Sequence, residues 1–269
     1  MNKVGLFLKH VAPYQLQYNI NVLKNYFPLI RDRHNVKSAL DVGCGPGDLT
    51  SAIFQFVEQD INEMIGIDIS PVMVDWANKA YGGVRIYFSK VDVQTIPKDF
   101  ENRFDCIFSF WTLHWITDQR TLYYNISKML KQRRSFLVSY IASSKIFDIF
   151  NEVPKREKYA PYVSSVNMHQ APFQKSANPQ RELVEILEHV GFKDISCNVE
   201  TVRFGNYTEN DIAGFFFALS PYYDYIPINL RMEFIRDHVH LVDTEQDASG
   251  QRHYYFDHTM FVVHGCKKP

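Results

Sequence analysis

The 269-residue sequence has few cysteines, no long apolar run and almost no net charge. Its four cysteines are scattered without the spacing of metal ligands, which argues against a zinc site and indicates reduced thiols. No stretch approaches the roughly 18–20 apolar residues of a membrane span, and the apolar run at residues 4–8 is too short for a signal peptide. A net charge of −1 gives no sign of a nucleic-acid partner. We therefore expect a cytoplasmic protein with no metal site and no membrane span.

Aromatic residues are abundant, at 15% of the chain. Aromatic side chains fill protein cores, but an excess also suits a deep pocket for an apolar ligand. Hydrophobic residues make up 46% and charged residues 22%, which is typical of a folded globular chain and argues against a disordered or fibrous one. The length allows one large α/β domain or two small ones, and we expect a single domain over residues 1–269.

Short apolar runs alternate with helical patterns through the first 180 residues, which is typical of βαβ units on a parallel sheet. Ser70 and Pro71 predict the start of a helix that runs to about Tyr81, and Asn178 predicts another that ends at Gly191. The expected strands are residues 38–42, 64–68, 84–88, 104–110, 135–141, 195–202 and 254–264.

Three segments interrupt this alternation, and we expect them to form a helical lid over the carboxyl ends of the strands. They are about residues 1–33, 144–177 and 206–245. The second has no clear period and holds three prolines. Connections this long in an α/β domain usually cover a functional site. Three consecutive aromatic residues, 215–217, cannot all point to one buried face, so we expect some of these rings to line a cavity.

A glycine-rich turn, D-V-G-C-G-P-G at residues 41–47, follows the first strand and opens a helix. Glycines let the backbone approach a ligand closely, and a helix N-terminus favours negative charge. The G-x-G-x-x-G spacing of dinucleotide-binding proteins is not met, because position 48 is Asp. Asp41 lies where a carboxylate could hold an ammonium group, which S-adenosylmethionine has and a nicotinamide dinucleotide lacks.

Two further aspartates follow strand ends. Asp68 ends the second strand, where an acidic side chain can accept both ribose hydroxyls of a nucleoside, with Ile69 and Met73 flanking the adenine. Asp92 follows the third strand and could accept from the adenine amine, while Val93 offers a backbone N–H. Together with Asp41, these carboxylates would make the pocket negative, which suits a sulfonium cation and would repel a pyrophosphate.

This combination resembles the class I S-adenosylmethionine-dependent methyltransferases over about residues 36–140. The resemblance implies a Rossmann-like, seven-stranded, mostly parallel sheet whose last strand, residues 254–264, is antiparallel. It also implies S-adenosylmethionine as the cofactor. The candidate contacts for this cofactor are Asp41, Gly43, Cys44, Gly45, Gly47, Asp68, Ile69, Met73, Asp92, Val93 and Phe110.

The string F-S-F-W-T-L-H-W-I-T-D-Q at residues 108–119 follows the fourth strand, and such loops face the ligand crevice of an α/β sheet. Together with E-H-V-G-F at 188–192, it resembles the insect juvenile hormone acid O-methyltransferases. That resemblance implies a long sesquiterpenoid acid as substrate, such as juvenile hormone acid or farnesoic acid. It also implies that Trp115 and a glutamine of the N-terminal helix hold the carboxylate. Gln15 and Gln17 are both candidates, and we favour Gln15, with His114 as a third contact.

The chemistry agrees with a carboxylate substrate. A carboxylate is ionised at pH 7, so methyl transfer would need no general base, only alignment and exclusion of water. Two alternatives stay open at this point. One is methyl transfer to another small acid or an amine, for which Arg120 is the nearest cation. The other is a non-catalytic homologue that binds the cofactor or a lipophile. A homodimer is a further possibility that the sequence leaves open.

Overall fold

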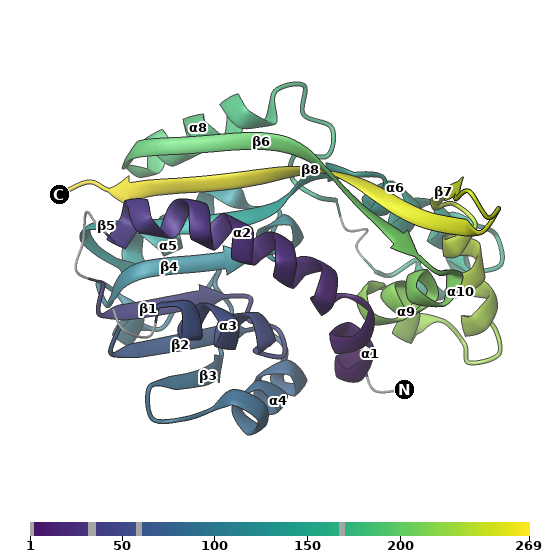
Figure 1. Ribbon diagram of the computed structural model, residues 1–269, viewed down its shortest axis with the longest axis horizontal. Helices are drawn as coiled ribbons and strands as arrows, with labels where there is room; N and C mark the ends of the chain where they lie inside the picture. Colours follow the sequence, from purple (N-terminus) through teal and green to yellow (C-terminus); the bar gives the residue numbers. More distant parts are fainter. Residues whose placement is uncertain (1–2, 32–35, 58–60, 167–169) are drawn as a thin grey trace.

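The computed structural model describes residues 3–31, 36–57, 61–166 and 170–269, and within them a mixed sheet runs through the molecule (Figure 1). The ends of the predicted lid segment 1–33 (residues 1–2 and 32–33) and residues 167–169 lie outside this description. The strands are β1 Ser38–Val42, β2 Glu63–Asp68, β3 Ile86–Lys90, β4 Phe104–Phe110, β5 Leu130–Ser144, β6 Phe192–Tyr207, β7 Asp243–Gln246 and β8 Arg252–Lys267. The helices are α1 Lys3–His10, α2 Ala12–Arg31, α3 Asp48–Val57, α4 Pro71–Tyr81, α5 Gln119–Met129, α6 Lys145–Glu152, α7 Ala160–Val163, α8 Pro179–Val190, α9 Glu209–Leu219 and α10 Arg231–Val239.

The strand order is β3-β2-β1-β4-β5-β8-β6, with β1 to β5 parallel and β8 antiparallel to both of its neighbours. This arrangement confirms the predicted mostly parallel, Rossmann-like sheet with an antiparallel last strand. The described residues add one strand to the predicted seven, because the short β7 pairs with the start of β8. Its four residues, D-T-E-Q, are polar and exposed, so no apolar alternation marked them as a strand.

Local sequence explains the elements nearest the site. Strands β1 and β4 are buried along their whole length, as expected for a parallel sheet covered on both faces. The Ser70 side chain accepts a hydrogen bond from the Met73 N–H and caps α4, as predicted. Strands β5, β6 and β8 are longer than predicted, and β6 and β8 run past the sheet towards the helices at its far end (Figure 1).

Helices cover both faces of the sheet, and their apolar residues form separate cores there. Val22, Leu23 and Phe27 of α2 pack with Ile53 and Val57 of α3 on one face. Residues of α5 and α8 fill the other face against the central strands. No helix within the described residues is long and apolar enough to cross a membrane.

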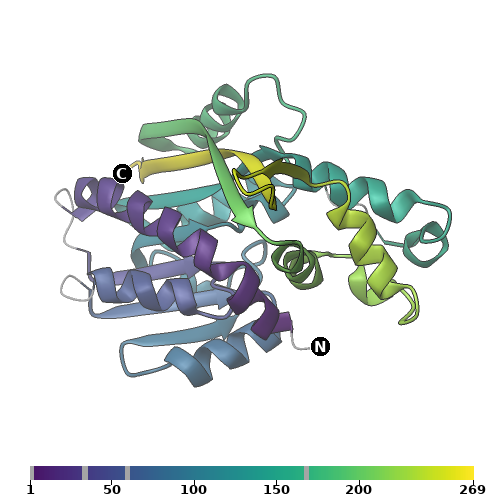
Figure 2. The same cartoon turned by 45° about the vertical axis from the view of Figure 1, so that its right-hand side comes forward.

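A third core lies beyond the carboxyl ends of the parallel strands, where α1, α6, α7, α9 and α10 pack on the projecting ends of β6 and β8. We call these five helices the cover. Figure 2 shows α9 beside α1, and the two helices are in contact. Residues 145–152, which the sequence interpretation treated as aperiodic, form the amphipathic helix α6 that buries Ile146, Phe147, Ile149 and Phe150.

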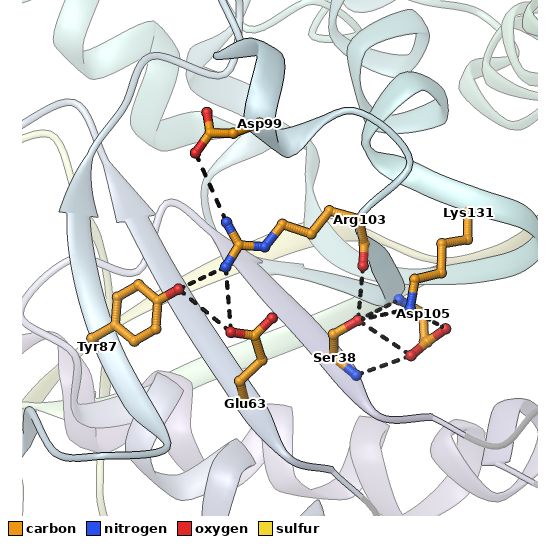
Figure 3. Close-up of polar contacts among 7 residues, drawn as sticks. All are labelled: Ser38, Glu63, Tyr87, Asp99, Arg103, Asp105 and Lys131. Atoms are coloured by element: carbon orange, nitrogen blue, oxygen red, sulfur yellow. Dashed lines mark hydrogen bonds and ion pairs between the residues drawn. The ribbon is translucent and has the colours of Figure 1, made fainter.

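The amino ends of the strands hold a network of ion pairs (Figure 3). Asp105 of β4 accepts hydrogen bonds from the Lys37 and Ser38 backbone N–H groups at 2.9 and 3.0 Å, and the Lys131 ammonium lies 3.1 Å away. The Arg134 guanidinium is also 3.1 Å from this carboxylate. These contacts fix the relative positions of β1, β4 and β5 at the end of the sheet remote from the cover.

Candidate active site

A cavity of about 400 Å³ lies between the carboxyl ends of the strands and the cover. The ends of β1, β2 and β4, the loops after β1 to β4 and the first turns of α3 and α4 form one part of its wall, and residues of α1, α2, α6, α9, β5 and β8 form the rest. The predicted cofactor contacts that line it are Gly43, Cys44, Gly45, Asp68, Ile69, Met73, Asp92, Val93 and Phe110. Gln15, His114 and Trp115 line it as well, so the structure brings the two predicted groups of site residues to one cavity.

Two of the three glycines in the glycine loop, Gly45 and Gly47, have different tasks. Gly47 has φ +85°, and a Cβ built there would lie 2.8 Å from the Cβ of Ala77, so this glycine lets α4 pack closely. It does not line the cavity. Gly45 has φ +53°, and a Cβ built there would have no neighbouring atom within 4 Å. Gly45 is therefore the position where the loop leaves room for a ligand.

Asp68 occupies the end of β2 and faces this loop. Its two carboxylate oxygens accept hydrogen bonds from the backbone N–H groups of Gly45, at 3.0 Å, and Ser70, at 2.8 Å. Burial raises the pKa of Asp68, and these N–H donors only partly offset that effect. A carboxylate oxygen accepts more than one hydrogen bond, so Asp68 can also accept from the hydroxyls of a bound ribose.

Asp41 does not line the cavity, which differs from the position that the sequence interpretation gave it. The side chain is 2% exposed and accepts a hydrogen bond from the Thr50 hydroxyl at 2.6 Å. Burial raises the pKa of Asp41 to about 7, and the nearby Asp68 and Asp48 carboxylates add to this effect. Asp41 therefore lies behind the glycine loop, outside the cavity wall.

Asp48, which the sequence interpretation did not single out, lines the cavity as the first residue of α3. Burial raises its pKa too. An acidic residue in the first turn of the helix after a glycine loop was a visible signal for it. Asp92 completes the acidic wall, and its side chain accepts a hydrogen bond from the Gln94 N–H at 2.9 Å.

The loop after β4 links the cofactor side to the rest of the cavity. The Thr112 hydroxyl donates to the Gly43 carbonyl at 3.1 Å, and the Trp111 indole N–H donates to the Asn19 side chain of α2 at 3.0 Å. Trp111 has φ +58°, a left-handed conformation that costs a non-glycine residue on the order of 1–3 kcal/mol. A backbone hydrogen bond from the Trp111 N–H to the Ser139 carbonyl helps to hold this conformation.

His114 and Trp115 follow in the same loop. The His114 Nδ1 accepts a long hydrogen bond, 3.4 Å, from the Ile141 backbone N–H, so a neutral ring carries its proton on Nε2. The Trp115 ring packs against Phe147 and Phe150 of α6, at 6.0 and 6.2 Å between ring centres. These contacts place an imidazole and an indole on the cavity wall between the sheet and the cover.

The N-terminal helices supply the remaining polar group. Gln15 of α2 is half-buried and lines the cavity, whereas Gln17 is exposed and donates a hydrogen bond to the Asn21 side chain. The geometry therefore favours Gln15 for any contact with a ligand.

The cover contributes an apolar wall to the cavity. Its lining residues are Phe7, Ile146, Phe147, Phe150, Phe215, Ala218 and Leu219. None of the lining residues is Lys or Arg within the described chain, and Arg120, the cation considered from sequence, is not among them. Of the aromatic run 215–217, Phe215 lines the cavity, as expected for part of this run. Phe216 and Phe217 are buried in the core that the cover forms, because α9 packs against other elements on more than one side.

This fold and site define the class. A Rossmann-like sheet with its antiparallel strand between β5 and β6 carries an open glycine loop after β1 and an acidic side chain at the end of β2. These are the features of a class I S-adenosylmethionine-dependent methyltransferase. The uncompensated carboxylates around Gly45 fit the cationic cofactor of that class.

Comparison with known proteins supports this class. Residues 33–191 match the methyltransferase domain family. The chain is 30% identical to juvenile hormone acid O-methyltransferase of Bombyx mori over 244 residues, covering 90% of this chain and 86% of that protein. It is 24% identical to the Drosophila melanogaster protein of the same name over 278 residues, 100% of this chain and 93% of the relative. The crystal structure of YcgJ from Bacillus subtilis shares the fold, with a TM-score of 0.58, 15% identity and coverage of 90% of this chain and 97% of that one.

The chain therefore belongs to the juvenile hormone acid O-methyltransferase family of methyltransferases. It is an S-adenosylmethionine-dependent enzyme.

Proposed function

We propose that this enzyme methylates the carboxylate of a lipophilic isoprenoid acid, of the juvenile hormone acid or farnesoic acid type, to its methyl ester. One observation carries the proposal: a single cavity joins an acidic half, around Gly45 and Asp68, to an apolar half under the cover. Among the described lining residues, the polar side chains of the apolar half are neutral. The names of the relatives from Bombyx mori and Drosophila melanogaster support the same substrate class.

In the acidic half, Asp68 would accept hydrogen bonds from the ribose hydroxyls, and Asp92 would accept one from the adenine amine. Gly45, which has no side chain, would leave room for the cofactor. Asp48, with Asp41 behind the loop, would supply negative charge for the cofactor cation. When bound, S-adenosylmethionine provides an electrophilic methyl group. The protein has only to hold the two reactants and exclude water.

In the apolar half, Gln15, His114 and Trp115 would hold the substrate carboxylate. The carboxylate is already ionised at neutral pH, so no general base is required. An amide, an imidazole and an indole N–H orient a carboxylate without the strong electrostatic trap that an arginine would create. The oxygen then stays nucleophilic while the apolar tail fills the wall formed by α6 and α9.

A methyl-transfer assay with labelled cofactor tests this function directly. The panel is farnesoic acid, its epoxide, a straight-chain fatty acid and a dicarboxylic acid. We expect the two isoprenoid acids to be methylated with the highest kcat/KM. Preferential methylation of the dicarboxylic acid, or no transfer to any acid, would contradict the proposal.

Variants at the carboxylate contacts test the mechanism. Trp115→Phe keeps most of the apolar area but loses the indole donor, so kcat should fall by more than KM rises, because the oxygen loses alignment. Gln15→Ala should behave alike, and the double variant should be less than additive if both donors hold one carboxylate. Gln17→Ala, exposed on the same helix, is the matched control. Full kcat in Trp115→Phe, with only reduced thermal stability, would make Trp115 a packing residue.

A further inference from the structure

His258 of β8 is a polar residue in the apolar half of the cavity for which the proposed carboxylate contacts leave no task. It is 3% exposed and lines the cavity. Along β8 it shares the buried face with Tyr254, Phe256 and Met260, at alternate positions. A histidine on the buried face of an otherwise apolar strand needs a partner for each ring nitrogen.

One ring nitrogen is accounted for within the protein. The Nδ1 of His258 lies 2.7 Å from the Ser144 hydroxyl oxygen, which also accepts the Ile146 N–H that begins α6. Among the described residues, Nδ1 is the only acceptor near enough for the Ser144 hydroxyl proton. Ser144 therefore donates to Nδ1, and the ring carries its own proton on Nε2.

The other nitrogen, Nε2, has no hydrogen-bond partner among the described residues, and the ring borders the cavity. Burial lowers the pKa of His258 to about 3, so the ring is neutral at physiological pH. The rings of Trp111, Phe204 and Phe256 surround it, at 5.7, 5.3 and 5.8 Å between ring centres. The cavity wall thus offers one neutral N–H donor within an aromatic frame.

The sheet order sets where this donor lies along a bound substrate. The cofactor residues follow β1, β2 and β3, and the proposed carboxylate contacts His114 and Trp115 follow β4. Strand β8 lies two positions beyond β4 in the sheet order, so His258 borders the cavity on the side opposite to the cofactor residues that follow β1, β2 and β3. That position places it beside the tail of a long acid and away from the reacting carboxylate.

We propose that the Nε2–H of His258 donates a hydrogen bond to an acceptor oxygen on the tail of the substrate, such as an ether, epoxide or carbonyl oxygen, and so selects oxygenated acids over hydrocarbon acids. The inference rests on the proposed function and deepens it. Ser144 is the positioning residue, because its hydroxyl fixes the proton on Nε2. A hydrocarbon tail would leave this buried donor unpaired, and a site with an unpaired polar group discriminates against such a ligand.

The test compares kcat/KM for one matched pair, farnesoic acid and its terminal epoxide. We expect the native enzyme to prefer the epoxide by about three- to tenfold, the range for one hydrogen bond. His258→Phe should reduce that ratio to about one, chiefly by slowing the epoxide reaction. His258→Gln, which keeps an N–H donor, should restore part of the ratio. Ser144→Ala, which leaves the ring proton free to move to Nδ1, should give an intermediate ratio.

Phe215→Leu is the control, because Phe215 lines the same apolar half without a polar atom. It should change both reactions alike and leave their ratio unchanged. Binding of S-adenosylhomocysteine, measured by calorimetry, checks that each variant is folded. If the His258 variants do not fold, the Ser144→Ala variant provides the test.

A native ratio near one, or an unchanged ratio in His258→Phe and Ser144→Ala, would overturn this inference while leaving carboxyl methylation intact. Failure of the native enzyme to methylate either acid would instead overturn the proposed function, and this inference with it.

Discussion

Two buried aspartates at opposite ends of the same pair of strands show what separates the structural end of this sheet from its functional end. Asp105, at the amino end of β4, and Asp41, at the carboxyl end of β1, are both 2% exposed. Asp105 has two backbone N–H donors, the Lys131 ammonium and the Arg134 guanidinium around it. Figure 3 shows its contacts with Ser38 and Lys131. Asp41 has the Thr50 hydroxyl as its hydrogen-bond donor and two other carboxylates nearby.

The pKa values of the two groups shift in opposite directions. Burial would raise the pKa of Asp105, but the N–H donors and Lys131 outweigh burial and lower it. Burial raises the pKa of Asp41 to about 7, and no cation among the described residues offsets this effect. The amino end of the sheet therefore supplies its own counter-charges. The carboxyl end leaves negative charge uncompensated, as a site for a cationic cofactor requires.

The largest expected effect is at the amino end. Asp105→Asn removes the negative charge that pairs with Lys131 and Arg134, and it turns an amide NH2 group towards these two cations while the amide oxygen keeps the Lys37 and Ser38 N–H groups. We expect a loss of about 3 kcal/mol in the free energy of unfolding, measured by chemical denaturation. The folded fraction should still bind S-adenosylmethionine with native affinity. A selective loss of cofactor affinity in this variant would break the division between the two ends.

At the carboxyl end we expect the reverse pattern. Asp68→Ala removes the proposed ribose acceptor and should weaken cofactor binding by about 1–3 kcal/mol, or roughly ten- to a hundredfold in Kd. Isothermal titration calorimetry with S-adenosylhomocysteine measures this loss. Unchanged affinity would move the adenosine site away from Asp68.

Per pH unit, a smaller effect appears in the pH dependence of stability. The folded-state pKa of Asp41 lies above the ordinary value, so the native state holds a proton that the unfolded state has lost between about pH 4 and 7. Across this window Asp41 makes the free energy of unfolding fall as the pH rises, by on the order of 1 kcal/mol per pH unit. Asp105, with its lowered pKa, has the opposite sign: its contribution is present at neutral pH and is lost as the pH falls through its folded-state pKa.

Urea denaturation of the native protein and Asp41→Asn from pH 4 to 8 isolates the Asp41 contribution. The difference between the two proteins should grow in favour of the variant as the pH rises. A constant difference would mean that the folded protein does not perturb Asp41.

The comparison also shows which parts of the site could be predicted from the sequence. The glycine loop and Asp68 are local features, because a strand, a tight turn and a helix lie within a few residues of one another. Whether Asp41 or Asp48 faces the cavity depends on how α3 packs behind the loop, and the spacing of the residues does not specify this. The ion-pair partners of Asp105 come from β1 and β5, which only the sheet order brings together.

The apolar half was less predictable for the same reason. The apolar pattern predicted the buried β8, but it gave no indication that β8 continues past the sheet and carries His258 to the cavity wall. Helix α6 was hidden by its short length of eight residues and by the prolines that follow it. The string at residues 108–119 predicted residues after β4 that line the cavity, because they are contiguous in sequence and remain together in space.

The proposal that the carboxyl end keeps uncompensated negative charge for the cofactor is tested most directly by the free energy of unfolding of Asp41→Asn. This is measured at pH 8, with and without saturating S-adenosylmethionine. Without cofactor, the variant should be at least as stable as the native protein, because it no longer buries an uncompensated charge. With cofactor, it should gain about 1 kcal/mol less than the native protein does, because part of the attraction for the cation is gone. The contrary result is a variant that loses stability, as Asp105→Asn does, and keeps the full stabilisation by cofactor. Asp41 would then be a structural residue, and its charge would not attract the cofactor.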